Sequence, residues 1–287
     1  MTDLEHDLIQ LCKRLKHGSY STQAGRRQML LLAARQLEEG GFRRMKATSL
    51  SSKHIDHLLA RWQQERLSPG TLKNRLAALR WWTQAVGRAG IIPAANSGLG
   101  LPRRHYINRM NKAKTLAPYL DKITDPYLKV SLRLQEAFGL RREEALKFRP
   151  AIADKGTVVY LQGSWTKGNR ERVIPILTAE QVAVLDDARA LAGEGSLIPP
   201  HKRYIEQRRL YDGQCLAAGL ENGHGLRHGY AQRRYEELTG WKCPMAGGPN
   251  PRTLCQADRI LDQAARTVIA EELGHSRESI TATYLGS

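Results

Sequence analysis

Residues 138–146 read Phe-Gly-Leu-Arg-Arg-Glu-Glu-Ala-Leu, which places one glycine between an apolar helical run and a charged helix start. Glycine commonly ends an α-helix, because it adopts the left-handed backbone conformation without steric cost. The stretch therefore predicts a helix over about 126–139 and a second helix that opens at Arg141-Arg142. Arg141 and Glu144 are expected to share one face of this second helix. Taken alone, such a pair is typical of a surface ion pair with little energetic effect.

A β-hairpin is predicted on the C-terminal side of this stretch. Residues 158–161 and 172–176 are rich in β-branched side chains, and a Gly/Asn/Lys turn at 167–170 separates them. A short helix is expected over 116–124, and the chain after the hairpin is expected to be mainly helical apart from a Pro/Gly loop at 243–252. The fold class is therefore mainly α with one small β-hairpin.

The first hundred residues predict four helices, over 4–16, about 22–39, about 52–66, and from Ser68-Pro69 to about Gly87. Their apolar residues recur at helical spacing, which favours a compact four-helix bundle. Residues 90–115 break this period with Pro, Gly, Asn and a cluster of basic side chains. The predicted organisation is a helical domain over 1–100, a basic linker over 101–115 and a second domain over 116–287.

Positive charge is concentrated in the first part of the chain. The 287 residues carry 45 Lys and Arg against 28 Asp and Glu, and residues 1–110 hold 19 of the basic and 7 of the acidic residues. Such a balance favours double-stranded DNA or another polyanion as the partner, because binding releases counterions from the phosphates. We expect phosphate contacts from basic residues of the fourth helix and the linker, namely Lys73, Arg75, Arg80, Arg103 and Arg104. Taken singly, each of these residues fits a solvated surface charge about as well as it fits a phosphate contact.

Several classes of protein are disfavoured. No apolar run reaches the roughly 18–20 residues that cross a bilayer, so no membrane association is expected. Cys12, Cys215, Cys243 and Cys255 lie far apart without a CxxC pair, which argues against a disulfide framework and against a zinc site. We expect a protein of the reducing cytoplasm that needs no metal or other cofactor.

Two further strings carry residues suited to phosphate chemistry. Residues 223–228, Gly-His-Gly-Leu-Arg-His, place His224 and Arg227 three positions apart, so both can face one cleft. Residues 273–276, Leu-Gly-His-Ser, place His275 nine positions before Tyr284. Arginine grips phosphate through a bidentate fork, and histidine transfers protons near neutral pH. Each string alone is weak evidence, because such pairs arise by chance and a lone Tyr near a chain end is usually a packing residue.

In combination and in this order, the strings resemble the tyrosine recombinases, the family of phage and mobile-element integrases. GLRREEAL matches the first box, with Arg141 at the catalytic arginine and Glu144 at its acidic partner. Residues 166–172 match the lysine turn, with Lys167 at the tip. His224-Gly225-Leu226-Arg227-His228 matches the second box, and LGHS puts His275 at the last histidine and Tyr284 at the nucleophile. The match covers roughly 116–287, and it implies that the N-terminal bundle is a SAM-like core-binding domain that closes around the far side of the DNA.

The resemblance implies a reaction on a DNA phosphodiester. Arg141 and Arg227 would neutralise the phosphate, Tyr284 would attack it to form a 3′-phosphotyrosyl intermediate, and His224 would accept the phenolic proton. Lys167 would protonate the departing 5′ oxygen, His275 would hydrogen-bond the phosphate and Glu144 would hold the cationic cluster. Strand exchange would run through a four-way junction, without metal or ATP. It would involve a homotetramer on two DNA sites, a monomer or dimer when free, DNA-bending accessory proteins and a place on the bacterial nucleoid.

The match departs from compact family members in two places. His275 lies 48 positions after Arg227, about twice the expected separation, and the surplus falls around 235–266. A DNA- or subunit-contacting insertion is favoured there over a zinc site or a solvent-exposed excursion. Three residues follow Tyr284, where relatives carry a helix that docks on a neighbouring subunit. We expect subunits to couple instead through the insertion or the N-terminal bundle.

Two other functions remain open. A type IB-like topoisomerase shares the same chemistry and would nick, swivel and reseal without exchanging partners. A DNA-binding regulator that has lost catalysis would bind without forming a covalent adduct, although the retention of every catalytic residue type argues against it.

Overall fold

The computed structural model describes residues 1–101 and 110–287, apart from the side chains of Ser97 and Glu278. The chain forms two compact units, one up to residue 105 and one from residue 106 onward, called unit 1 and unit 2 below. Part of the predicted linker, with Arg103 and Arg104, lies outside the described residues. No helix in the described ranges combines the length and apolar character that crossing a membrane requires.

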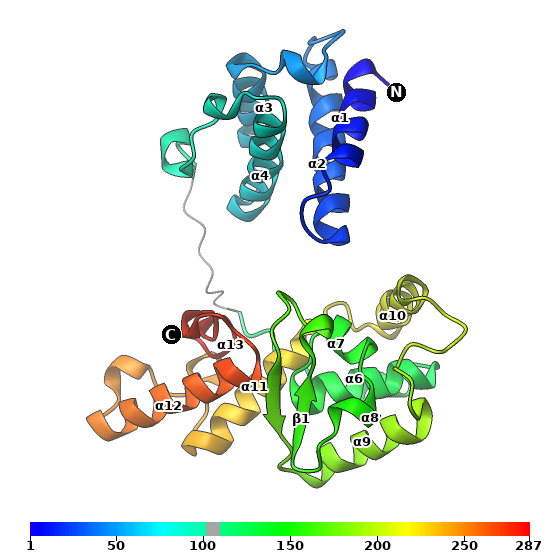
Figure 1. Ribbon diagram of the computed structural model, residues 1–287. Helices are drawn as coiled ribbons and strands as arrows, with labels where there is room; N and C mark the ends of the chain where they lie inside the picture. Colours follow the sequence, from blue (N-terminus) through cyan, green and yellow to red (C-terminus); the bar gives the residue numbers. More distant parts are fainter. Residues whose placement is uncertain (102–109) are drawn as a thin grey trace. The chain divides into compact units, whose positions relative to one another are not determined.

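Unit 1 is a bundle of four helices (Figure 1), α1 (Asp3–Arg14), α2 (Tyr20–Glu39), α3 (Ser52–Gln64) and α4 (Pro69–Ala85). The predicted start of α4 is confirmed: Ser68 caps it by accepting a hydrogen bond from the Thr71 amide, with Pro69 in the first turn. Three 3₁₀ turns lie between or after the helices, at Ala47–Ser49, Ala89–Ile91 and Asn96–Leu99.

Two buried tryptophans fix the core of unit 1. The Trp62 indole N–H donates to Gln36 Oε1 at 2.8 Å, and the Trp82 indole N–H donates to the Ala47 carbonyl at 2.9 Å. Both side chains are almost fully buried, so each ring fills the core while its single polar atom keeps a partner. These bonds tie α3 to α2, and α4 to the first 3₁₀ turn.

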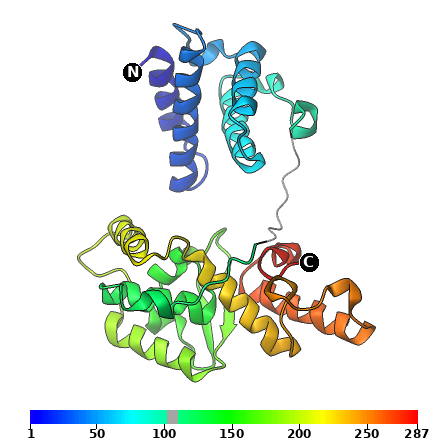
Figure 2. The same ribbon diagram turned by 180° about the vertical axis from the view of Figure 1, so that it is seen from behind.

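Unit 2 is built around α6 (Pro126–Phe138), which packs against α7, α9 and α11 (Figure 2). Leu134 and Phe138 of α6 are fully buried in its main core. The other helices are α5 (Ala117–Leu120), α7 (Arg142–Leu146), α8 (Pro150–Ala153), α9 (Ala179–Ala192), α10 (Tyr204–Ala218), α11 (His224–Thr239), α12 (Gln256–Glu272) and α13 (Ala282–Leu285).

The helix predicted over 116–124 is wrong in length, since only Ala117–Leu120 is helical. Pro126 disfavours helical backbone at Asp125, whose side chain instead caps α6 by accepting from the Leu128 amide at 2.9 Å. The residues between the two helices form a turn.

The predicted hairpin is an antiparallel pair, β1 (Val158–Leu161) and β2 (Arg172–Pro175), in which Val158 pairs with Pro175 and Leu161 with Arg172. A 3₁₀ turn (Gly163–Trp165) and the turn at 167–170 join the strands. The predicted fold class is confirmed: in the part of the chain that the structure describes, the protein is mainly helical with one small sheet. The predicted loop at 243–252 contains two 3₁₀ turns, Pro244–Ala246 and Pro251–Thr253.

Candidate active site

The junction between α6 and α7 brings the first motif into the interior of unit 2. Gly139 has φ of +61°, and a Cβ atom there would lie 2.5 Å from a ring carbon of Tyr230. Glycine is therefore required both for the backbone conformation and for the close approach. Arg141 follows as the residue that precedes α7. Its amide donates to Glu144 Oε2 at 2.7 Å, and its guanidinium donates to Glu144 Oε1 at 2.8 Å.

Glu144 is 1% exposed and also pairs with Arg172, a residue for which the motifs predict no role. Arg172 Nη1 and Nη2 donate to the two carboxylate oxygens at 2.9 and 2.6 Å. Burial alone would raise the pKa of Glu144, but the Arg172 bonds and the charges of Arg141 and Arg227 outweigh it and lower the pKa to about 2. The pair of Arg141 and Glu144, predicted to lie at the surface, is thus part of a buried network in which Glu144 holds Arg141 and Arg172.

Arg227 lies on α11 and is completely buried. Its guanidinium donates to the carbonyls of Gly139 and Leu273, which fixes its plane between the α6–α7 junction and the end of α12. Burial, followed by the positive charge of Arg141, lowers the pKa of Arg227 to about 10, so the group stays charged at neutral pH. A fixed, desolvated cation of this kind is suited to stabilising a developing negative charge.

Tyr284 lies on α13 and is 6% exposed. Its hydroxyl is 3.0 Å from His224 Nε2 and 3.4 Å from Arg227 Nε. The phenol ring packs against two imidazoles, with centroids 4.3 Å from His228 and 5.1 Å from His275. The hydroxyl therefore faces one group that can accept a proton and one that can stabilise a phenolate.

Three histidines around the phenol are held neutral. Desolvation, and then the charges of Arg227 and Arg141, lower the pKa of His224 to about 4, although this residue keeps an exposed edge. The same causes lower the pKa of His275 to about 3. Burial lowers the pKa of His228 to about 4, and its Nδ1 has no hydrogen-bond partner among the described residues. Neutral imidazoles can accept protons at pH 7, which a general base requires.

Both ring nitrogens of His275 have a hydrogen-bond partner, which orients the imidazole. Its Nδ1 lies 3.1 Å from Thr281 Oγ1, and its Nε2 lies 3.4 Å from Arg227 Nη2. The structure therefore brings five of the six predicted catalytic residues together with Glu144, namely Arg141, His224, Arg227, His275 and Tyr284.

Lys167 is the predicted catalytic residue that stands apart. It lies in the turn between β1 and β2, is exposed, and makes no hydrogen bond or ion pair with any described residue. Its neighbour Gly168 has φ of +80° and Asn169 has φ of +55°, which fits a tight turn.

The predicted DNA contacts Arg75 and Arg80 have partners inside unit 1. Arg75 lies 3.6 Å from Glu65 and over the Trp62 ring. Arg80 donates to the Pro93 carbonyl and to Asn96 Oδ1, both at 2.7 Å. Lys73 is half-buried on the same helix, α4.

The two ends of the stretch 235–266 are tied into the fold, whereas residues 247–261 are exposed or half-buried. Tyr235 donates to Asp262, which pairs with Arg266 at 2.9 Å, and Arg266 donates to the Gly286 carbonyl at 2.9 Å. All three side chains are at least nine-tenths buried. Cys243 is buried and Cys255 caps α12, and within the described ranges no group of three His, Cys, Asp or Glu side chains could hold a metal ion.

Comparisons with known proteins match both units of the chain. A family model described as the phage integrase N-terminal domain matches residues 1–92, and a model described as integrase matches residues 112–233. The second match contains Arg141, Lys167, His224 and Arg227, and it ends before His275 and Tyr284. The chain is also 26% identical over 258 residues to the tyrosine recombinases XerC of Shewanella sp. (strain W3-18-1) and Shewanella putrefaciens (strain CN-32 / ATCC BAA-453), covering 82% of this chain and 83% of each relative.

Solved structures share the fold at low sequence identity. A lambda integrase dimer bound to a COC′ core site matches with a TM-score of 0.63 and 16% identity, covering 98% of this chain and 76% of that one. The XerH site-specific recombinase bound to its difH substrate matches with a TM-score of 0.58 and 15% identity, covering 98% of this chain and 80% of that one.

Proposed function

The chain belongs to the tyrosine recombinase family, and from that membership we propose that it cuts and rejoins duplex DNA at specific sites through a covalent bond to Tyr284. The observation that carries the proposal is the placement of the Tyr284 hydroxyl, 3.0 Å from the neutral His224 and beside the buried Arg227. A phenol needs help to react at pH 7, because its ordinary pKa is about 10. A neighbouring base and a neighbouring cation both supply that help.

The reaction follows from these groups. The Tyr284 oxygen attacks the phosphorus as its proton passes to His224, and the bond from phosphorus to the 5′ oxygen breaks. Arg141 and Arg227 neutralise the charge of the pentacovalent transition state, while His275 hydrogen-bonds a non-bridging oxygen. Lys167 gives its proton to the departing 5′ oxygen. Attack by a 5′ hydroxyl from a second duplex reverses these steps and joins the new strand, so no external energy source is required.

Lys167 reaches the reacting phosphate in this scheme by movement of its turn when DNA binds. Glu144 keeps Arg141 in place throughout the reaction, and the carbonyls of Gly139 and Leu273 do the same for Arg227. In this scheme Lys167 moves and the arginines stay fixed, which fits the exposed position of Lys167 and the buried position of the Glu144 network.

Partners follow from the same chemistry. Two duplexes with two strands exchanged on each require four active sites, so we propose a homotetramer on two DNA sites and a monomer or dimer when free. Solved relatives include a lambda integrase tetramer bound to a Holliday junction. Unit 1 would add phosphate contacts through Lys73, Arg75 and Arg80, and accessory proteins would bend the DNA. The expected location is the bacterial cytoplasm, on the nucleoid.

The test captures the covalent intermediate on a pool of genomic DNA fragments, so that no target site has to be chosen in advance. Purified protein is mixed with sheared genomic DNA of its source organism, the reaction is stopped with detergent, and DNA attached to protein is sequenced at its 3′ ends. We expect adducts at one short inverted repeat, linked through Tyr284 in a tryptic peptide. Adducts scattered over arbitrary sequence would indicate a topoisomerase, and binding without any adduct would indicate a DNA-binding regulator.

A further inference from the structure

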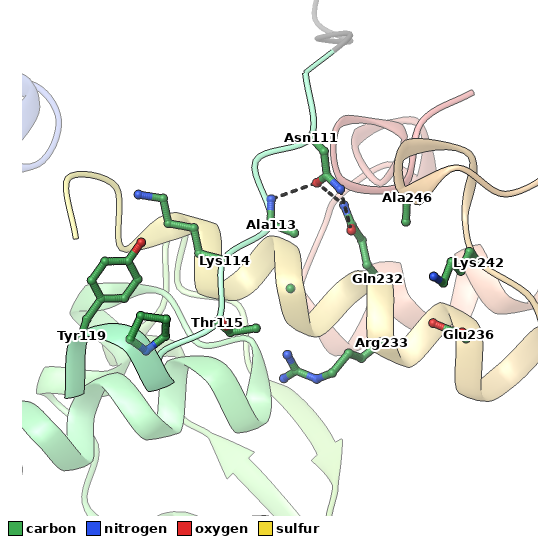
Figure 3. Close-up of a pocket in the computed structure, with 12 residues that line it drawn as sticks. Asn111, Ala113, Lys114, Thr115, Tyr119, Gln232, Arg233, Glu236, Lys242 and Ala246 are labelled. Carbon is green, nitrogen blue, oxygen red and sulfur yellow. Dashed lines mark hydrogen bonds between the residues drawn. The ribbon is translucent and has the colours of Figure 1, made fainter. Parts of the chain in front are cut away.

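A chain of hydrogen bonds links the backbone of Tyr284 to the segment that enters unit 2. Gln232 Nε2 donates to the Tyr284 carbonyl at 3.1 Å. It also donates to Asn111 Oδ1 at 2.8 Å, a bond drawn in Figure 3. Asn111 Nδ2 donates back to Gln232 Oε1 at 3.2 Å. Gln232 lies on α11 and is 8% exposed. Both of its donors and its acceptor are engaged, so the position of its amide is fixed from two sides.

Asn111 is exposed but makes one more hydrogen bond within its own segment. Its Oδ1 also accepts from the Ala113 amide at 2.9 Å, which closes a local turn. The next residues lie directly on α11, where the Lys114 amide donates to the Gly225 carbonyl at 3.0 Å. A Cβ at Gly225 would lie 2.7 Å from the Lys112 carbonyl, and a Cβ at Gly229 would lie 2.6 Å from the Lys114 carbonyl. Two glycines one helical turn apart therefore let this segment rest on the helix that carries Gln232.

The Tyr284 segment depends on such side-chain anchors. Helix α13 contains only four residues, and its own backbone bonds run to Thr281 and Ala282. Outside these, Gln232 binds the Tyr284 carbonyl and Arg266 binds the Gly286 carbonyl. Arg266 is anchored by Asp262 of its own helix, whereas Gln232 is anchored by Asn111. The two anchors thus connect the segment to different parts of the chain.

We propose that Gln232 is a positioning residue that makes the placement of Tyr284 depend on residues 111–114, the segment that rests on α11. Gln232 passes a shift of Asn111 to the backbone of Tyr284. This inference rests on the proposed role of Tyr284 as the nucleophile, while the physical connection rests on the hydrogen bonds alone.

The first experiment measures the connection without any DNA. Hydrogen–deuterium exchange followed by mass spectrometry reports the amides of residues 281–286 in the full chain. Gln232→Met removes the amide at nearly constant volume, and Asn111→Ala removes its partner. Each is expected to speed exchange in this peptide by about 3- to 10-fold, the effect of losing one hydrogen bond.

The matched control is Gln181→Met. Gln181 is 6% exposed and donates to the Ala137 carbonyl at 2.9 Å, so it is also a buried glutamine bound to a backbone carbonyl of unit 2. This variant should leave exchange of 281–286 unchanged. An equal change in the control would show that general loosening of unit 2 is responsible and would overturn the proposal. If Gln232→Met fails to fold, Asn111→Ala carries the same test at a less buried position.

The second experiment measures the rate of covalent adduct formation in a single turnover at saturating protein. We expect Gln232→Met and Asn111→Ala to slow this step by about 10-fold with DNA affinity within about twofold, and the double variant to match the single variants, because the residues act in series. Normal rates in Asn111→Ala, or multiplicative losses in the double variant, would overturn the coupling. Failure of the proposed function would appear as no adduct from the unmodified chain, which leaves the exchange result intact as a test of the connection.

Discussion

The cluster around Tyr284 and the turn that carries Lys167 serve one proposed reaction. They differ in burial and in hydrogen bonding. Arg227, Glu144 and Tyr284 are at least nine-tenths buried. Arg227 donates to the Tyr284 hydroxyl, and Glu144 accepts from Arg141 and Arg172. Lys167, in contrast, is exposed on the 167–170 turn without a described partner. The groups that stabilise charge are thus assembled before DNA binds, which avoids reorganisation at the moment of reaction. In the proposed reaction, the proton donor Lys167 is not part of this assembled cluster.

The largest effect is expected at the centre of the buried cluster. Tyr284→Phe removes only the attacking oxygen, so covalent adducts should disappear while DNA affinity stays within about twofold. Gel analysis of detergent-stopped reactions beside a filter-binding titration measures both. Adducts that persist in this variant would place the nucleophile on another residue and would break the division between a prepared cluster and a mobile donor.

Arg227→Ala tests whether the buried cation is held for chemistry or for folding. The rate of adduct formation should fall by about 10³-fold or more, since a fixed donor to the transition state is lost. The unfolding free energy should fall by at most about 4 kcal/mol. Two buried carbonyls lose a donor at about 1–3 kcal/mol each, and removal of a desolvated charge, whose burial lowers the pKa of Arg227, offsets part of that cost. Denaturant unfolding and single-turnover kinetics separate these outcomes, and severe unfolding with residual activity would assign Arg227 a structural role instead.

Lys167→Ala tests the other half of the comparison. We expect about 10²-fold slower cleavage, near the lower end for loss of a general acid, because an exposed turn admits water that can also deliver a proton. Unfolding free energy should stay within about 0.5 kcal/mol, as for other exposed positions. A DNA substrate with a 5′ bridging sulfur, whose leaving group needs no proton, should restore the rate. Absence of that rescue would remove Lys167 from the role of proton donor.

How far the sequence predicts the molecule can be judged from the same two regions. Helix starts such as Ser68-Pro69 and the turn at 167–170 were predictable, because caps and turns depend on neighbours in the chain. The candidate catalytic residues came from motif order, and the structure brings most of them to one place.

Arg172, His228 and Gln232 were not predicted, because their partners lie far away in sequence: Arg172 reaches Glu144, His228 stacks on Tyr284 and Gln232 bonds to Asn111. Strand periodicity held one usable signal for Arg172, which lies on the same inward side of β2 as the buried Ile174. A signal for Gln232 was its spacing from Gly225 and Gly229, which places all three residues on one face of α11.

Acid should weaken the buried cluster. His228 has a folded pKa of about 4 against an ordinary value of 6.5, so the unfolded chain binds a proton that the folded chain does not. Stability is therefore complete above pH 6.5 and is lost as pH falls toward 4. The lowered pKa of His275 acts in the same direction between pH 6.5 and about 3, and that of Glu144 between pH 4.5 and about 2. His228→Phe should reduce the stability difference between pH 7 and pH 4.5 by about 2 kcal/mol in urea unfolding, and an unchanged difference would mean that His228 is protonated in the fold.

The smallest effect extends the comparison to unit 1, where Arg80 is held by Pro93 and Asn96 yet lies on the basic helix α4. DNA affinity of the unmodified chain should fall with salt at a log–log slope of about −0.9 per phosphate contacted. In the proposed interface, Arg80→Ala lowers the magnitude of that slope by about 0.9. It also lowers the unfolding free energy by about 1 kcal/mol, because two acceptors lose their donor. A stability loss with an unchanged slope would show that Arg80 stabilises unit 1 and does not contact the DNA. Arg80 would then differ from Arg227, which is bound by the protein and is also proposed to meet the phosphate.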